Sequence, residues 1–76
     1  MLRVEYYVLS SGNRWTIKYD GKEYPYDTQA EALDAAVLAA HASGKNGYDA
    51  QVLVQGENGQ WRTEWTYGRD PYPPAG

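Results

Sequence analysis

Apolar and polar residues alternate along the first third of the chain, as they do in half-buried β-strands. Residues 3–9, RVEYYVL, are mostly β-branched or aromatic and run into the turn-forming sequence SSGNR. A second such run, WTIKY, leads to Asp20-Gly21, a type I′ hairpin signal, and then to KEYPY. The pattern predicts three strands joined by two hairpins. The third should be short and at a sheet edge, because Pro25 cannot donate to a ladder.

A two-residue loop at Asp20-Gly21 also fixes which residues face each other. The predicted pairs are Tyr19 with Lys22, Lys18 with Glu23, Ile17 with Tyr24, and Trp15 with Tyr26. One face of this hairpin is then apolar and aromatic, and Lys18 and Glu23 lie opposite each other on the other face. If the first hairpin loop also has an even number of residues, Val4, Tyr6 and Val8 lie on the same apolar face.

The middle of the chain, DTQAEALDAAVLAAHASG, has the spacing of an amphipathic helix. Thr28 followed by Glu31 is a capping box, and Gly44 suits the left-handed position just past a helix end. The predicted apolar stripe is narrow and made of Leu33, Val37 and Ala40, with Ala30 and Ala36 beside them. Such small side chains allow a helix to lie close to a sheet whose larger rings fill the gap.

After a connecting loop, AQVLVQ and QWRTEWT flank Asn58-Gly59, a second type I′ signal. A two-residue loop there predicts the pairs Gly56 with Trp61, Val54 with Thr63, Leu53 with Glu64, and Val52 with Trp65. Val52, Val54, Trp61 and Trp65 would form the apolar face. The sequence thus predicts an α+β fold of order β-β-β-α-β-β, an antiparallel sheet with one helix packed across one face. Residues 1–67 would form this single domain, and 68–76 a Pro-rich C-terminal segment.

Composition narrows the classes of function. The 76 residues include no cysteine, so neither disulfides nor thiolate metal sites are expected, and a reducing cytoplasm is the expected location. Neither a signal peptide nor a membrane-spanning stretch is predicted. The formal net charge of −3 disfavours a phosphate backbone unless the basic residues gather on one surface. Eight Tyr and three Trp with no Phe give every ring a polar atom, which suits either a small core near the surface or an interface.

Several stretches together resemble a known family. These stretches are YYVLSSGNRWTIKY, the Ala-rich helix, AQVLVQGENGQW and the ending TYGRDPYPP. In them the chain is similar to domain-of-unknown-function family 2188, which comprises small uncharacterised bacterial proteins. The matching positions are Val8, Trp15, Thr28, Glu31, Ala32, Gly59, Tyr67, Gly68, Asp70, Pro71, Pro73 and Pro74. The resemblance implies the same fold over nearly the whole chain and implies no activity.

No constellation of residues indicates catalysis. His41, the only histidine, lacks a nearby set of metal ligands, and a favourable interaction with the helix dipole explains it better. Glu31 and Asp34 are one turn apart, but negative charge is favoured early in a helix without any acid/base role. The glycines stand singly at turns and make no phosphate cradle. We therefore predict no enzyme, no catalytic residue, no metal and no cofactor.

The remaining candidate is the sheet face opposite the helix. It would display aromatic and basic residues interleaved with glutamates. The predicted interaction face comprises Arg3, Tyr7, Leu9, Arg14, Lys18, Leu53 and Arg62. The favoured hypothesis is a small non-catalytic interaction module that binds another protein or a second copy of itself. The alternative is a single-stranded nucleic-acid-binding protein that uses the same face.

The ending YGRDPYPPAG contains too many prolines for a helix or a central strand. Pro71 and Pro74 fit the minimal polyproline ligand pattern, but apolar ring faces are close at hand in the preceding strand. We predict that the segment folds back as a clasp, with Asp70 turning the chain, Tyr72 or Pro73 against an aromatic ring, and only Ala75-Gly76 free. The clasp residues are Tyr67, Asp70, Pro71, Tyr72, Pro73 and Pro74.

Overall fold

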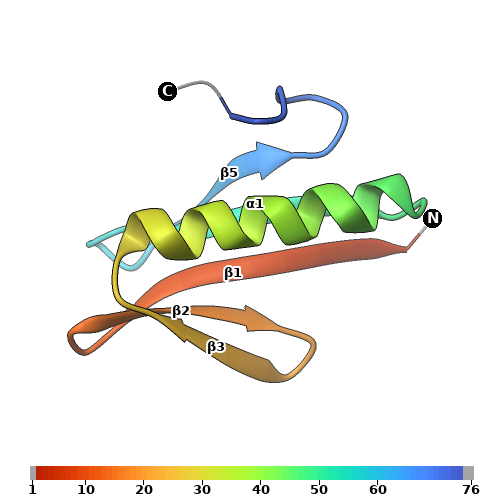
Figure 1. Ribbon diagram of the computed structural model, residues 1–76. Helices are drawn as coiled ribbons and strands as arrows, with labels where there is room; N and C mark the ends of the chain where they lie inside the picture. The colour runs from red at the N-terminus through yellow and green to blue at the C-terminus, as the bar shows by residue number, and fades with distance from the viewer. Residues whose placement is uncertain (1, 75–76) are drawn as a thin grey trace.

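The computed structural model describes residues 2–74 of the chain. Its elements are β1 (Arg3–Ser11), β2 (Arg14–Tyr19), β3 (Lys22–Tyr26), α1 (Gln29–Lys45), β4 (Asp49–Gln55) and β5 (Trp61–Thr66). All strands join one sheet, and α1 crosses one face of it (Figure 1). The predicted α+β class and the order β-β-β-α-β-β are confirmed.

The sheet has the strand order β3-β2-β1-β4-β5 and is mixed rather than wholly antiparallel. Its three hairpins are antiparallel, whereas β1 and β4 pair in parallel at the centre, with Tyr6 opposite Val52 and Val8 opposite Val54. The reason is the helix, which carries the chain back along the sheet, so that β4 must run in the same direction as β3. Because β3 and β1 both run antiparallel to β2, β4 is then parallel to β1.

The register of the β2–β3 hairpin is as predicted, from Tyr19 opposite Lys22 to Trp15 opposite Tyr26. Asp20 and Gly21 have φ values of 52° and 75°, which a type I′ turn requires. The loop between β1 and β2 also has two residues, Gly12 and Asn13, because Ser11 pairs with Arg14. Tyr6 and Val8 are consequently buried on the helix side of the sheet.

The predicted register of the β4–β5 hairpin is wrong over most of its length. The Gly56 N–H donates to the Gln60 carbonyl at 2.8 Å, so the loop has three residues, with Gly59 at φ 81°. A three-residue loop with Gly in the left-handed position shifts every pair near it by one. A bulge then restores the predicted pair of Val52 with Trp65. The observed pairs between loop and bulge are Gln55 with Trp61, Val54 with Arg62, and Leu53 with Thr63.

The helix begins as predicted and ends later. The Thr28 hydroxyl accepts the Glu31 N–H at 3.1 Å, as its side of a capping box requires. Gly44, predicted just past the end, lies inside the last turn, and the left-handed residue after the helix is Gly47 at φ 97°. The reason for Gly44 is packing, because an added Cβ would overlap the ring of Tyr67.

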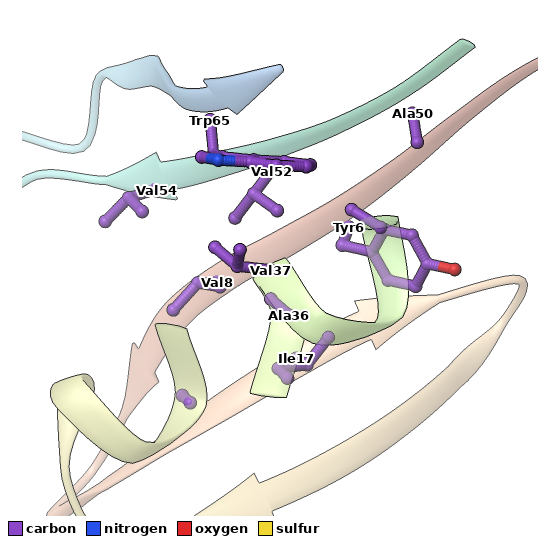
Figure 2. Close-up of a cluster of buried hydrophobic side chains, with 11 residues drawn as sticks. Tyr6, Val8, Ile17, Ala36, Val37, Ala50, Val52, Val54 and Trp65 are labelled. Carbon is purple, nitrogen blue, oxygen red and sulfur yellow. The ribbon is translucent and has the colours of Figure 1, made fainter. Parts of the chain in front are cut away.

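The buried face of α1 is a row of the smallest side chains at four-residue spacing: Ala32, Ala36, Ala40 and Gly44, with Val37 beside them. This row is rotated about the helix axis relative to the predicted stripe. Ala30 and Leu33 were predicted to be in the stripe, but Ala30 is exposed and Leu33 is half-buried. Valines of β1 and β4 and the ring of Trp65 fill the space beneath it. Figure 2 shows Trp65, Val52 and Val37 meeting in this core. Small residues on the helix therefore accommodate large ones on the sheet.

Candidate functional site

The helix covers one face of the sheet, and no element of residues 2–74 covers the other (Figure 1). We call this uncovered surface the open face. Its centre is Tyr7 on β1, which pairs with Lys18 of β2 on one side and with Leu53 of β4 on the other. Leu9 lies two residues further along β1 on the same face. The structure thus brings Tyr7, Leu9, Lys18 and Leu53 together.

Trp61 also lies on the open face, which the sequence did not predict. It pairs with Gln55, and its ring meets that of Tyr7 edge to face, with centroids 5.2 Å apart. Trp61 is 42% exposed. The sequence placed Trp61 beside Trp65 in the core because residues four apart share a face in a regular strand. The bulge in β5 separates them, and the Asn58-Gly59 signal does not reveal it because it suits a two-residue loop as well as a three-residue one.

The same shift removes Arg62 from the predicted interaction face. Arg62 pairs with Val54, which is buried on the helix side, and cross-strand partners point to the same side. Its Nε lies 3.4 Å from the Glu64 carboxylate. Arg62 therefore belongs to the surface around the helix rather than to the open face.

The other two predicted cations lie toward the margins of the open face. Arg3 stands at the start of β1 opposite Asp49. Arg14 begins β2, and its guanidinium lies 3.1 Å from the Asp27 carboxylate, both side chains being mostly exposed. Exposed pairs of this kind contribute roughly 0–1 kcal/mol to stability. The cations surround the apolar centre without forming a continuous basic track.

A hydrogen bond fixes the Tyr7 ring. Its hydroxyl donates to Glu5 Oε1 at 2.7 Å. This bond to a carboxylate raises the pKa of Tyr7 above its ordinary value of 10.0, and burial and the negative charge of Glu5 raise it further. The hydroxyl is consequently protonated at neutral pH, and the ring presents its face and edge to whatever covers the sheet.

The C-terminal segment returns along the outside of β5 (Figure 1). The Asp70 carboxylate accepts the Thr66 N–H at 2.8 Å, and the Asp70 N–H donates to the Thr66 carbonyl at 3.0 Å. The Pro71 carbonyl accepts the indole N–H of Trp65 at 2.9 Å. Asp70 turns the chain here, and both backbone groups of Thr66 that would continue the free edge of the sheet are used within the chain.

Aromatic rings gather where this segment meets the helix. Tyr72 stacks on His41 with centroids 3.8 Å apart and planes 10° apart. Trp65 meets both of these rings, and Tyr67 meets His41 and Trp65, at larger angles. His41 thus lies in an aromatic cluster near the end of α1. Pro73 and Pro74 are exposed, and the predicted freedom of Ala75-Gly76 concerns residues outside those described.

Neither a metal centre nor a membrane segment is found in the part of the chain that the structure describes. Among residues 2–74, no three His, Asp or Glu side chains converge as ligands. Over the same residues, no helix has the length and hydrophobicity needed to cross a bilayer. That the chain is not an enzyme stays a prediction.

The comparison with protein families settles the classification. The model of domain-of-unknown-function family 2188, described as an uncharacterized protein conserved in bacteria, matches residues 6–67. The chain belongs to this family. The match to family 2188 extends from Tyr6 in β1 to Tyr67 after β5, so it covers the sheet and the helix and ends before the Pro-rich segment. No curated protein and no solved structure matches the chain.

Proposed function

We propose that this member of family 2188 is a non-catalytic interaction module that pairs with a second copy of itself through the open face. One observation carries the proposal: Tyr7, Leu9, Leu53 and Trp61 form a continuous apolar strip over the central strands, and nothing in residues 2–74 covers it. Grouped apolar residues of this kind, rimmed by charged ones, mark interaction surfaces.

The position of the strip in the sheet supports a protein partner. β1 and β4 are parallel, and parallel strands are ordinarily covered on both faces. Here the helix covers only one face. A second sheet packed on the other would give the central pair its usual burial, at the spacing of about 10 Å typical of packed sheets.

Charge favours a second copy over a polyanion. The open face carries three cations, Arg3, Arg14 and Lys18, and four carboxylates, Glu5, Glu23, Asp49 and Asp27, the last being the ion partner of Arg14. Three positive against four negative charges leave no excess of positive charge for a polyanion. Two such faces, with both signs interspersed, can instead bring opposite charges together.

The size of the molecule is also adequate. A stable interface buries about 800 Å² on each partner. The two larger dimensions of the molecule are 34 Å and 29 Å, so a sheet face can supply an area of this order.

Single-stranded nucleic acid is the alternative occupant. The Tyr7 and Trp61 rings could stack bases, and Lys18 and Arg3 could contact phosphates. Against it stand the lack of an excess of positive charge on the face, the pairing of Arg14 with Asp27, and the position of Arg62 on the other side. This alternative predicts binding that weakens steeply with salt.

Sedimentation analysis over a range of concentrations tests the proposal. We expect the wild type to self-associate and Leu53→Asp to remain monomeric, because a charge at the centre of the interface would be buried without a partner. Leu38→Asp is the matched control, since Leu38 is 60% exposed on the helix. A monomeric wild type at the highest concentration would contradict the proposal. Low-salt binding to a labelled single strand would favour the alternative.

A further inference from the structure

A cleft of about 300 Å³ lies on the helix side of the sheet, away from both the open face and the C-terminal segment. Its walls are four tyrosines and two alanines: Tyr6, Tyr19, Tyr24, Tyr26, Ala35 and Ala39. The side chain of Ile17 lines it as well. Half of the eight tyrosines in the chain are therefore concentrated around one hollow.

The fold explains the hollow. The β2–β3 hairpin extends past the helix, as Figure 1 shows, so the helix does not cover the hairpin completely. Ala35 and Ala39 face the hairpin and are too small to close the space between the two. Tyr24, at 42% exposure, lies at its outer wall.

Contacts hold two of the four tyrosine rings in place. Tyr6 and Tyr19 stack with centroids 4.4 Å apart, and the Tyr6 hydroxyl and the Ser43 hydroxyl share a hydrogen bond of 2.7 Å. The proximity of Tyr6, chiefly through charge repulsion, raises the pKa of Tyr19, and burial raises it further. The faces of tyrosine rings are electron-rich and attract cations.

The charges around the cleft complement a cation. None of its lining residues is basic. Glu31 precedes Ala35 and Ala39 at four-residue spacing, so it extends the same helical row, and it forms no ion pair within residues 2–74. At the tip of the β2–β3 hairpin, the negative charge of Asp20 and the positive charge of Lys22 cancel.

We propose that this cleft binds a quaternary ammonium group, as carried by choline or by trimethyllysine. Tyrosine rings on several sides are the recognised means of holding such a cation, because its charge is spread over methyl groups that pack on ring faces. A volume of about 300 Å³ accommodates the trimethylammonium group with part of the chain attached to it.

The test is a titration followed by amide and methyl shifts of the full chain. Choline is compared with 3,3-dimethylbutanol, which has the same shape without the charge. We expect choline to bind on the order of tenfold more tightly and to shift Ala35, Ala39 and Tyr24. Equal binding of the two compounds, or binding of neither, would overturn the proposal. A trimethyllysine peptide distinguishes a protein source of the group from a choline headgroup.

Variants localise the effect. Tyr24→Leu removes a ring and should weaken choline binding on the order of tenfold, whereas Tyr24→Phe keeps the ring and should retain it. Tyr72→Leu is the matched control, since Tyr72 is also 42% exposed but stacks on His41. Leu53→Asp should bind choline like the wild type, so failure of the proposed dimer and failure of this site give different results. Unchanged binding in Tyr24→Leu would also overturn the proposal.

Discussion

Gly44 and Tyr67 show how single residues determine the join between the helix and the end of the sheet. The Tyr67 ring packs directly against the Cα of Gly44, in space that any side chain would occupy. Tyr67 in turn meets His41 and Trp65. A glycine that costs helix stability locally is therefore required by the packing of another element.

Gly44→Ala should destabilise the domain although alanine is the better helix former. The gain in helix propensity is about 1 kcal/mol, whereas overpacking costs typically 1–3 kcal/mol and would displace the Tyr67 ring from its cluster. We expect a net fall of about 1 kcal/mol in the free energy of unfolding, measured by urea denaturation.

The reverse exchange at a neighbouring position is the control. Ala42 is exposed in the same turn of the helix, so Ala42→Gly changes helix propensity without changing the packing. It should lower the free energy of unfolding by at most about 1 kcal/mol. Alanine would then be the more stable residue at position 42 and glycine at position 44. Equal or greater stability of Gly44→Ala would contradict the packing of Tyr67 on Gly44.

The Tyr7–Glu5 bond predicts a dependence of stability on alkaline pH. The folded-state pKa of Tyr7 lies above 10.0, so the folded protein holds this proton more tightly than the unfolded chain. The contribution of the Tyr7–Glu5 bond to the free energy of unfolding is therefore complete below pH 10 and is lost as the pH rises through the folded-state pKa of Tyr7. The difference in unfolding free energy between wild type and Tyr7→Phe should shrink over this range, measured by denaturation at dilute protein concentration. A difference independent of pH would show that the bond contributes nothing.

At the scale of elements, the two later hairpins show what sequence can and cannot give. Asp20-Gly21 specified its turn and all five pairs of β2 and β3. Asn58-Gly59 looks equivalent, but a loop of two residues and a loop of three with a compensating bulge both place Val52 opposite Trp65. The two differ only in the residues between, and these include Trp61 and Arg62. The error therefore fell on the candidate site and on Trp61, which was wrongly assigned to the core, whereas Val52, Val54 and Trp65 were correctly placed there.

The parallel pairing of β1 with β4 could not be predicted from the sequence, for a different reason. Hairpin pairs are fixed by short loops, whereas the position of β4 depends on how a long helix returns the chain. The predicted elements and the helix start were correct because each has a local signal. A glycine at position 44 is compatible either with the end of the helix or with a close contact to another element, and only the tertiary packing distinguishes the two.

The C-terminal segment should act as a stabilising element. Deleting residues from Gly68 onward removes the partner of the buried Trp65 N–H, the Asp70 bonds to Thr66 and the Tyr72 stack on His41. An unsatisfied buried donor alone costs about 1–3 kcal/mol. For a domain of this size we expect the melting temperature to fall on the order of 10 °C.

A point substitution separates the turn from the rest of the segment. Asp70→Ala should lower the melting temperature by part of the deletion's effect, and Glu57→Ala, which removes an exposed carboxylate from the β4–β5 loop, should not. An unchanged melt after the deletion would instead favour a role for the prolines as a ligand for another protein.

At the scale of the whole molecule, the two faces of the sheet differ in kind. The helix face holds the core and the tyrosine cleft. The open face has charges of both signs around an apolar centre over a parallel strand pair. Membership of family 2188, shown over residues 6–67, assigns no activity. The uncovered apolar strip of the open face is the feature on which we base the proposed interaction.

The most direct test of that argument is an isotope-filtered nuclear Overhauser measurement on a mixture of labelled and unlabelled protein. Only contacts between different copies give signals in this experiment. The account predicts intermolecular contacts from the Trp61 indole and Tyr7 ring to the methyl groups of Leu9 and Leu53. Intermolecular contacts confined to the helix or the C-terminal segment, or none in a concentrated sample, would contradict it.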